Sequence, residues 1–155
     1  MDALMDVRPA TAGDEAAIVE MAAVAVPETF PHLNFSPTRT RESFRRSLAD
    51  QAPVYFVVET PARQVVGFQV VAWGNSDFST ALVVEQRVIF VRPEFRGSDA
   101  AASLIRHLVQ WAERLGADEM YVNVASGRRQ QSTARYIRRF GFTDVGSVLR
   151  KTRQP

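Results

Sequence analysis

The segment from Ala81 to Ala125 most constrains what this 155-residue chain can fold into. The apolar run ALVVEQRVIFV, at 81–91, leads through a turn at Gly97 into an amphipathic stretch that ends before Gly116. A second apolar run, EMYVNVA, follows at 119–125. A strand, a helix from Asp99 to Leu115 and a second strand in this order predict a crossover unit of a mixed α/β fold.

The rest of the chain alternates in the same way, without repeats or a long linker, so we expect one domain over residues 1–155. A short strand at Val7 precedes a helix that ends near Pro27, a proline-rich loop and a basic helix at 38–50. The runs PVYFVVE and QVVGFQVVAW predict a hairpin through TPAR. The last helix stops at Gly141, and FTDVGSVLRK, at 142–151, is expected to be a final strand.

Composition excludes several classes of site. The chain has no cysteine and only two histidines, His32 and His107, so neither a disulfide framework nor a metal site is expected. No apolar stretch approaches the roughly 20 residues that span a bilayer, so we expect a cytoplasmic protein without a membrane segment. Cations dominate from Gly127 onward, which favours a phosphate-bearing partner, either a cofactor or a nucleic acid.

The turn Arg96-Gly97-Ser98 is the most informative local feature. A strand that enters a helix through a glycine turn leaves free backbone N–H groups at the helix start, where an anion can bind. The alternative is an ordinary connection between a strand and a helix.

The chain resembles the GCN5-related N-acetyltransferase (GNAT) family. The resemblance is carried by VRPEFRGSDAAASLIRHLVQWAERLGA at 91–117 and by FGF at 140–142, and it is strongest to bacterial and phage members with an RGS loop. It implies a mostly antiparallel central sheet with helices on both faces and acetyl-CoA as co-substrate. The family pattern [Q/R]-x-x-G-x-[G/A] falls on Arg96 to Ala101. The implied cofactor-binding residues are Val91, Arg96, Gly97, Ser98, Asp99, Ala100 and Ala101.

Asp99 departs from this pattern, because it stands where the family has a glycine. A carboxylate aimed at a pyrophosphate would be repelled by about 4 kcal/mol at 4 Å and an effective dielectric constant near 20. We therefore expect Asp99 to point away, as the first helical residue after a Ser98 cap, with its backbone N–H still facing the anion.

The family chemistry is direct acetyl transfer from a thioester to an amine, which needs a base and an acid. The resemblance implies a carboxylate base on the strand before the loop, and Glu85 is the candidate for it; simple alternation places Glu85 on one face with Arg87, Ile89 and Val91. The alternative is that Glu85 pairs with Arg87 or another cation. His32 and Asp77, in loops, are weaker candidates.

Tyr136 is the candidate acid, although the family's usual tyrosine position falls on its neighbour Ile137. Adjacent helix residues point about 100° apart, so Tyr136 replaces that hydroxyl only if the helix is turned; otherwise it is an ordinary buried aromatic residue.

Three functions remain open at this stage. The favoured one is an acyl-CoA-dependent N-acetyltransferase acting on a primary amine; a CoA-binding protein without turnover follows, and a nucleic-acid-binding module is the least favoured. Phe30, Phe35 and Phe44 line an acceptor pocket or belong to the core. Family habit alone favours a homodimer.

Overall fold

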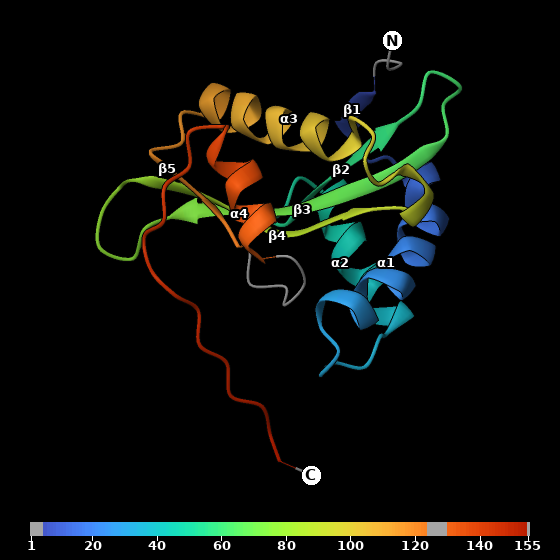
Figure 1. Cartoon of the computed structure of the whole chain (residues 1–155), viewed down its shortest axis with the longest axis horizontal. Helices are drawn as coiled ribbons and strands as arrows, with labels where there is room; N and C mark the ends of the chain where they lie inside the picture. Colours follow the sequence, from blue (N-terminus) through green and yellow to red (C-terminus); the bar gives the residue numbers. More distant parts are fainter. Residues whose placement is uncertain (1–4, 124–129, 155) are drawn as a thin grey trace.

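The computed structural model describes residues 5–123 and 130–154, and it shows a five-stranded sheet with helices on both faces (Figure 1). The elements are β1 (Asp6–Pro9), η1 (Ala12–Asp14), α1 (Glu15–Thr29), α2 (Pro37–Leu48), β2 (Val54–Glu59), β3 (Val65–Asn75), β4 (Leu82–Val91), η2 (Pro93–Phe95), α3 (Ala100–Leu115), β5 (Glu119–Val122) and α4 (Gln130–Arg138). No helix in these two ranges is long and apolar enough to cross a membrane.

The strands lie in the order β1-β2-β3-β4-β5. The first four are antiparallel neighbours, and β2 and β3 form the predicted hairpin, with Tyr55 opposite Val70. β5 pairs with β4 in parallel, with Val84 opposite Met120, so the predicted strand–helix–strand unit is confirmed. The mixed, mostly antiparallel sheet agrees with the predicted fold class.

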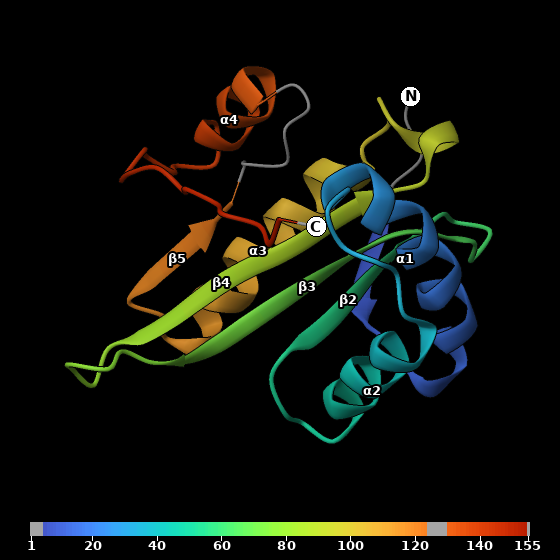
Figure 2. The same ribbon diagram turned by 90° about the horizontal axis from the view of Figure 1, so that it is seen from below.

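Helices lie on both sides of the sheet (Figure 2), and a hydrophobic layer fills the interface on each side. α1 and α2 cover one face, where Phe44 is fully buried against Tyr55; Phe44 is therefore core, and Phe35 packs at its edge. α3 covers the other face, where Leu108 packs against Phe56. Under α3, buried Gln69 donates from Nε2 to the Leu104 carbonyl at 2.9 Å, which satisfies an otherwise costly polar group.

A β-bulge in β4 changes which residues share a face. Val70 pairs with Val88 and Val71 with Gln86, so Arg87 is the extra residue. Before the bulge the even-numbered residues face α3, as Val84 does; after it the odd-numbered residues do, as Val91 does. Glu85 therefore lies on the α1/α2 side of the sheet. The predicted shared face of Glu85 with Ile89 and Val91 was wrong, because one inserted residue inverts a two-residue period.

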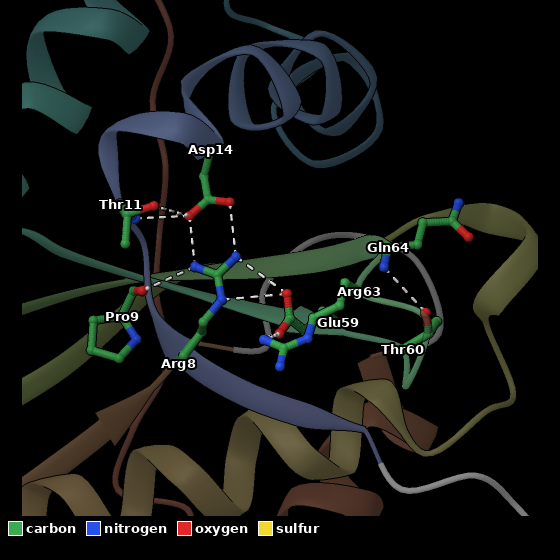
Figure 3. A network of polar contacts seen from close by, with 8 residues as sticks. All are labelled: Arg8, Pro9, Thr11, Asp14, Glu59, Thr60, Arg63 and Gln64. Atoms are coloured by element: carbon green, nitrogen blue, oxygen red, sulfur yellow. Dashed lines mark hydrogen bonds and ion pairs between the residues drawn. The ribbon is translucent and has the colours of Figure 1, made fainter.

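An arginine at the sheet edge joins three elements (Figure 3). Arg8 of β1 donates to both carboxylate oxygens of Asp14, at 2.7 and 3.0 Å, and to Glu59 at 3.2 and 3.3 Å. Asp14 also accepts from the Thr11 N–H at 2.7 Å. Both acids are almost completely buried, so this guanidinium neutralises charge that is otherwise shut away from water.

Three element boundaries differ from expectation. α1 continues through Pro27 to Thr29, because the proline removes only one bond near the helix end and the Phe30 N–H still reaches the Val26 carbonyl at 2.7 Å. Asp99, rather than Ser98, is the N-cap residue of α3. Residues 142–154 contain no strand, so the predicted final strand was wrong; the segment has no backbone pairing partner in the described chain, and its C-terminal end runs away from the body (Figure 1).

Candidate functional site

The start of α3 presents a cluster of free backbone donors. The first helical turn has no preceding carbonyls to bond, and the N–H groups of Gly97, Asp99, Ala101 and Ala102 have no acceptor among residues 5–123 and 130–154. Two N–H groups of the turn are used locally: that of Ser98 donates to the Phe95 carbonyl at 3.2 Å, and that of Ala100 donates to the Ser98 hydroxyl oxygen at 3.2 Å. A 16-residue helix directs its positive end to this place, so the turn is suited to hold an anion.

Gly97 allows this turn and keeps it open. Its φ of +88° lies in the left-handed region, which costs glycine little and other residues more. A Cβ built on Gly97 would have no heavy atom within 4 Å. A side chain at this position would therefore strain the backbone but would meet no neighbouring atom.

Arg96 connects the turn to α1. Its Nε donates to the Val91 carbonyl at 2.9 Å, its Nη2 lies 2.7 Å from Oε2 of Glu28, and its guanidinium carbon lies 5.4 Å from the centre of the Phe90 ring. Phe90 belongs to the face that α1 covers. The side chain thus reaches the face opposite α3, and a direct contact between Arg96 and a bound anion stays a prediction.

Asp99 has its charge balanced within α3. Its Oδ2 accepts a hydrogen bond from the Ser103 hydroxyl at 3.0 Å and lies 2.8 Å from Nη2 of Arg106. The carboxylate therefore lies along the first turns of the helix and beside a cation. A glycine at this position would remove the ion pair with Arg106.

A groove of about 1540 Å³ surrounds β5 between β4, α3, α4 and the segment after α4. Glu85 lines it, is exposed, and has no hydrogen bond or ion pair with any described residue. The alternative in which Glu85 pairs with Arg87 is thus not what the structure shows. A free carboxylate in a groove is available to accept a proton, although its catalytic role stays a prediction.

The two candidates for the acid separate on α4. Ile137 is buried and lines the groove, whereas Tyr136 is not among the lining residues and packs its ring against Phe140 at 5.5 Å. Burial raises the pKa of Tyr136; among smaller effects, Arg106 of α3 lowers it and Asp99 at the start of α3 raises it. Tyr136 therefore faces the first half of α3, and its assignment as the acid stays a prediction.

The remaining candidates lie apart from this arrangement. His32 is exposed in the loop after α1, at 6.3 Å from the Phe30 ring, and Asp77 is exposed in the turn between β3 and β4. Sequence reasoning missed Glu28 and Arg106, the partners of the two charged residues in the turn. Glu28 is 68 positions from Arg96, so no local pattern could have shown the contact.

Comparison with known proteins now decides the family. The profile described as the Acetyltransferase (GNAT) family matches residues 17–142, which is most of the chain. This protein is a member of the GNAT acetyltransferase family. Its members use acetyl-CoA as co-substrate, and the free donors at α3 lie within the matched range. No protein of curated function matches the sequence.

Solved structures agree on the fold. A transcriptional regulator from Bacillus halodurans C-125 has a TM-score of 0.80 at 15% identity, over 96% of this chain and 99% of that one. A probable acetyltransferase has a TM-score of 0.77 at 18% identity, over 97% of both chains. An aminoglycoside antibiotic 6'-N-acetyltransferase from Acinetobacter baumannii has a TM-score of 0.71 at 18% identity, over 98% of this chain and 99% of that one. At such identities the similarity describes the fold alone.

Proposed function

We propose that this protein is an N-acetyltransferase that moves the acetyl group of acetyl-CoA to a primary amine, within a single domain over residues 1–155. The observation that carries the proposal is the cluster of four free N–H groups at the start of α3, in a chain that belongs to the GNAT family. The CoA pyrophosphate would accept from these groups. Val91 and Arg96 to Ala101 would form the wall of this site.

In the proposed reaction the amine nitrogen attacks the thioester carbonyl, the new C–N bond forms and the C–S bond breaks. Glu85 accepts the proton that leaves the amine, directly or through a water molecule, because its carboxylate is exposed to the groove and forms no ion pair with a described residue. The proton that the departing thiolate takes up comes from Tyr136 if α4 turns, or from water. Direct transfer forms no enzyme-bound acyl group, so a chain without cysteine can perform it.

One observation favours a second function, that of a CoA-binding protein without turnover. Ile137 lies in the groove at the family's usual tyrosine position, and it has no proton to donate. The N–H cluster at α3 would still bind CoA in such a protein. The two functions therefore differ in thioester cleavage and agree in CoA binding.

The first test is the stabilisation of the full chain by CoA. A ligand that binds only the native state adds about 2.7 kcal/mol at a hundredfold excess over its dissociation constant, so CoA should raise the melting temperature. Gly97→Glu should remove the shift, because it adds bulk and negative charge at the proposed pyrophosphate position.

Gly116→Glu is the matched control for that variant. Gly116 closes the other end of α3, has a φ of +80°, and likewise has nothing within 4 Å of a built Cβ. The two variants therefore bring the same strain and the same charge. A melting temperature of the unmodified chain that does not respond to CoA would exclude both CoA-based functions.

The second test separates the two. CoA release is followed with acetyl-CoA and a panel of primary amines, with and without protein. Amine-dependent release supports the transferase, and Glu85→Gln should reduce it by about 10²–10⁴-fold while leaving the thermal shift with CoA unchanged. CoA binding with no release for any amine supports the binding protein.

A further inference from the structure

Two glutamines are buried in the apolar layer beneath α3. Gln69 of β3 is fully buried, and Gln86 of β4 is only 2% exposed. Gln86 donates from Nε2 to Oε1 of Gln69 at 2.7 Å, and Gln69 donates from Nε2 to the Leu104 carbonyl of α3 at 2.9 Å. Neither amide has a buried atom that lacks a partner within residues 5–123 and 130–154. A chain of two hydrogen bonds therefore connects β4, β3 and α3.

The last acceptor fixes the direction of this chain. A carbonyl oxygen can only accept, so Gln69 must present its NH2 group to Leu104. The oxygen of the same amide then faces Gln86, which must present its own NH2 group. Each amide therefore has one orientation that satisfies the chain, and that orientation depends on where α3 lies.

Stability alone does not account for amides at these two positions. The neighbouring contacts under α3 are apolar: on one side of Gln69, Val71 belongs to a cluster with Leu108, and on the other side Val66 belongs to a cluster with Leu104. Apolar residues of similar shape in place of a buried polar pair are often neutral or stabilising. What a hydrogen-bonded pair adds is direction, because apolar contacts have little directional preference.

The chain of bonds joins the two halves of the proposed site. Adjacent strand residues point to opposite faces, so Gln86, turned towards α3, leaves its neighbour Glu85 turned towards the α1/α2 side. At the other end of the chain, Leu104 lies two residues beyond Ala102, whose N–H is one of the free donors. Two residues are about 3 Å along a helix axis. The bonds therefore run from beside the candidate base to beside the donors.

We propose that Gln69 and Gln86 are positioning residues, which hold the first turns of α3 at one place on the sheet and so set the distance between the free donors and Glu85. A slide of α3 by about 1 Å would stretch the bond to Leu104 beyond the usual range of about 2.7–3.2 Å. An error of about 1 Å between reacting groups can cost about 10²-fold in rate. The catalytic purpose of this distance rests on the proposed function.

The test variant is Gln69→Met/Gln86→Met. Methionine has a similar length, and because both partners are replaced together, no buried polar group of the pair is left behind. The melting temperature should therefore stay within a few degrees of that of the unmodified chain. Gln69→Leu/Gln86→Leu takes its place if this variant does not fold.

The matched control is Tyr55→Phe. It removes a largely buried hydroxyl from the opposite face of the sheet, where Tyr55 and Ser43 share a hydrogen bond at 2.8 Å. The control therefore loses a hydrogen bond between a strand and a helix without touching α3.

The first experiment measures the position of α3 and needs no substrate. The chain has no cysteine, so Phe78→Cys and Gln110→Cys, at two exposed positions, can carry a pair of spin labels. Phe78 lies in the β3–β4 turn and Gln110 on α3, so the distance between the labels reports the helix relative to the sheet. The distribution of distances should be narrow in the otherwise unmodified chain and in Tyr55→Phe. In the double methionine variant it should broaden or shift.

The second experiment compares binding with turnover. The free donors belong to the backbone of α3, so the double methionine variant should keep the thermal shift with CoA. Its amine-dependent release of CoA from acetyl-CoA should fall by about 10–100-fold, because the donor is held but its thioester is displaced from Glu85. Tyr55→Phe should change neither the thermal shift nor the turnover by more than about twofold.

Three outcomes would overturn the proposal: label distances that the double variant leaves unchanged, turnover that it leaves unchanged, or a loss of CoA binding as large as the loss of turnover. The last outcome would show a damaged anion site rather than a changed distance. If the unmodified chain releases no CoA with any amine, the proposed function fails, and the label distances still decide whether the two amides hold α3 in place.

Discussion

Replacement of Arg8 by methionine should destabilise the fold strongly and in a pH-dependent way. The side chain is only partly exposed, and its guanidinium makes four hydrogen bonds to Asp14 and Glu59, whose side chains are 8% and 4% exposed. Methionine keeps the apolar stem but removes every donor. Two carboxylates then remain buried near the β1–β2 edge without their principal cation (Figure 3).

The expected loss of unfolding free energy depends on the partners that each carboxylate keeps after the substitution. Removing one partner of a buried ion pair costs about 3–5 kcal/mol. Asp14 keeps the Thr11 N–H at 2.7 Å, and Glu59 keeps Arg63 at 3.7 Å, so we expect the lower end, about 3 kcal/mol. For a domain of this size that loss lowers the melting temperature by roughly 6–12 °C.

The pH dependence provides the sharper test. Hydrogen bonds from Arg8 hold the pKa of Asp14 below its ordinary value of 3.8. This stabilisation is fully present above pH 3.8 and is lost as the pH falls through the lowered pKa. In Arg8→Met the burial of Asp14 is opposed only by its hydrogen bonds with Thr11, so the pKa of Asp14 should rise and protonation at lower pH should relieve part of the penalty. The difference in unfolding free energy between the two proteins should therefore shrink as the pH falls from about 7 toward about 4.

Urea denaturation across this pH range measures the difference, and Arg39→Met is the matched control. Arg39 pairs with Glu42 at 2.8 Å, but the two side chains are 70% and 52% exposed, so its loss should cost no more than about 1 kcal/mol. Equal effects of the two substitutions at neutral pH, or a difference that does not change with pH, would refute the reasoning.

Three further predictions concern the site and α3. Ile137→Tyr should raise acetyl transfer if the groove is otherwise competent, whereas Tyr136→Phe should change turnover by a few-fold at most, because Tyr136 lies outside the groove; steady-state CoA release measures both. Arg96→Ala should lower the melting temperature without CoA, because it removes the bonds to Glu28 and Val91, and thermal unfolding shows this. Burial lowers the pKa of His107 below 6.5, so the free energy of unfolding should fall as the pH drops below about 6.5. Urea titrations should show this pH dependence in the unmodified protein and not in His107→Leu.

Much of the fold could be predicted from the sequence, because it depends on local signals. Gly116, with its φ of +80°, ends α3 where the sequence indicated, and the apolar periodicity of 81–125 predicted a strand, a helix and a strand. The prediction of a final strand was wrong because it depends on a non-local contact. Val145 to Leu149 have the composition of a strand, but a strand also needs a neighbour, and composition does not show whether one is present.

The candidate site was predictable where it depends on backbone and not where it depends on side-chain direction. A glycine turn before a helix predicts free N–H groups, and they are free in the described structure. The contact of Arg96 with Glu28 joins residues 68 positions apart, and the face of Glu85 depends on one bulged residue, Arg87. Neither leaves a local pattern, because a bulge occupies one residue and a long-range ion pair needs only one charge at each end.

The bulge in β4 and the turn before α3 together constrain the shape of an acyl donor that binds at both places. β5 pairs with β4 only up to Gln86, opposite Val122, while β4 continues to Val91 and the turn with the free N–H groups follows. Glu85 lies where the pairing of β4 with β5 ends. Six residues of strand, at about 3.3 Å each, separate Glu85 from Val91 by roughly 20 Å. A donor that is held at α3 by its phosphates and reacts beside Glu85 must therefore be long and narrow, with its anionic group and its reactive carbon at opposite ends, which is the chemistry of an acyl thioester of CoA.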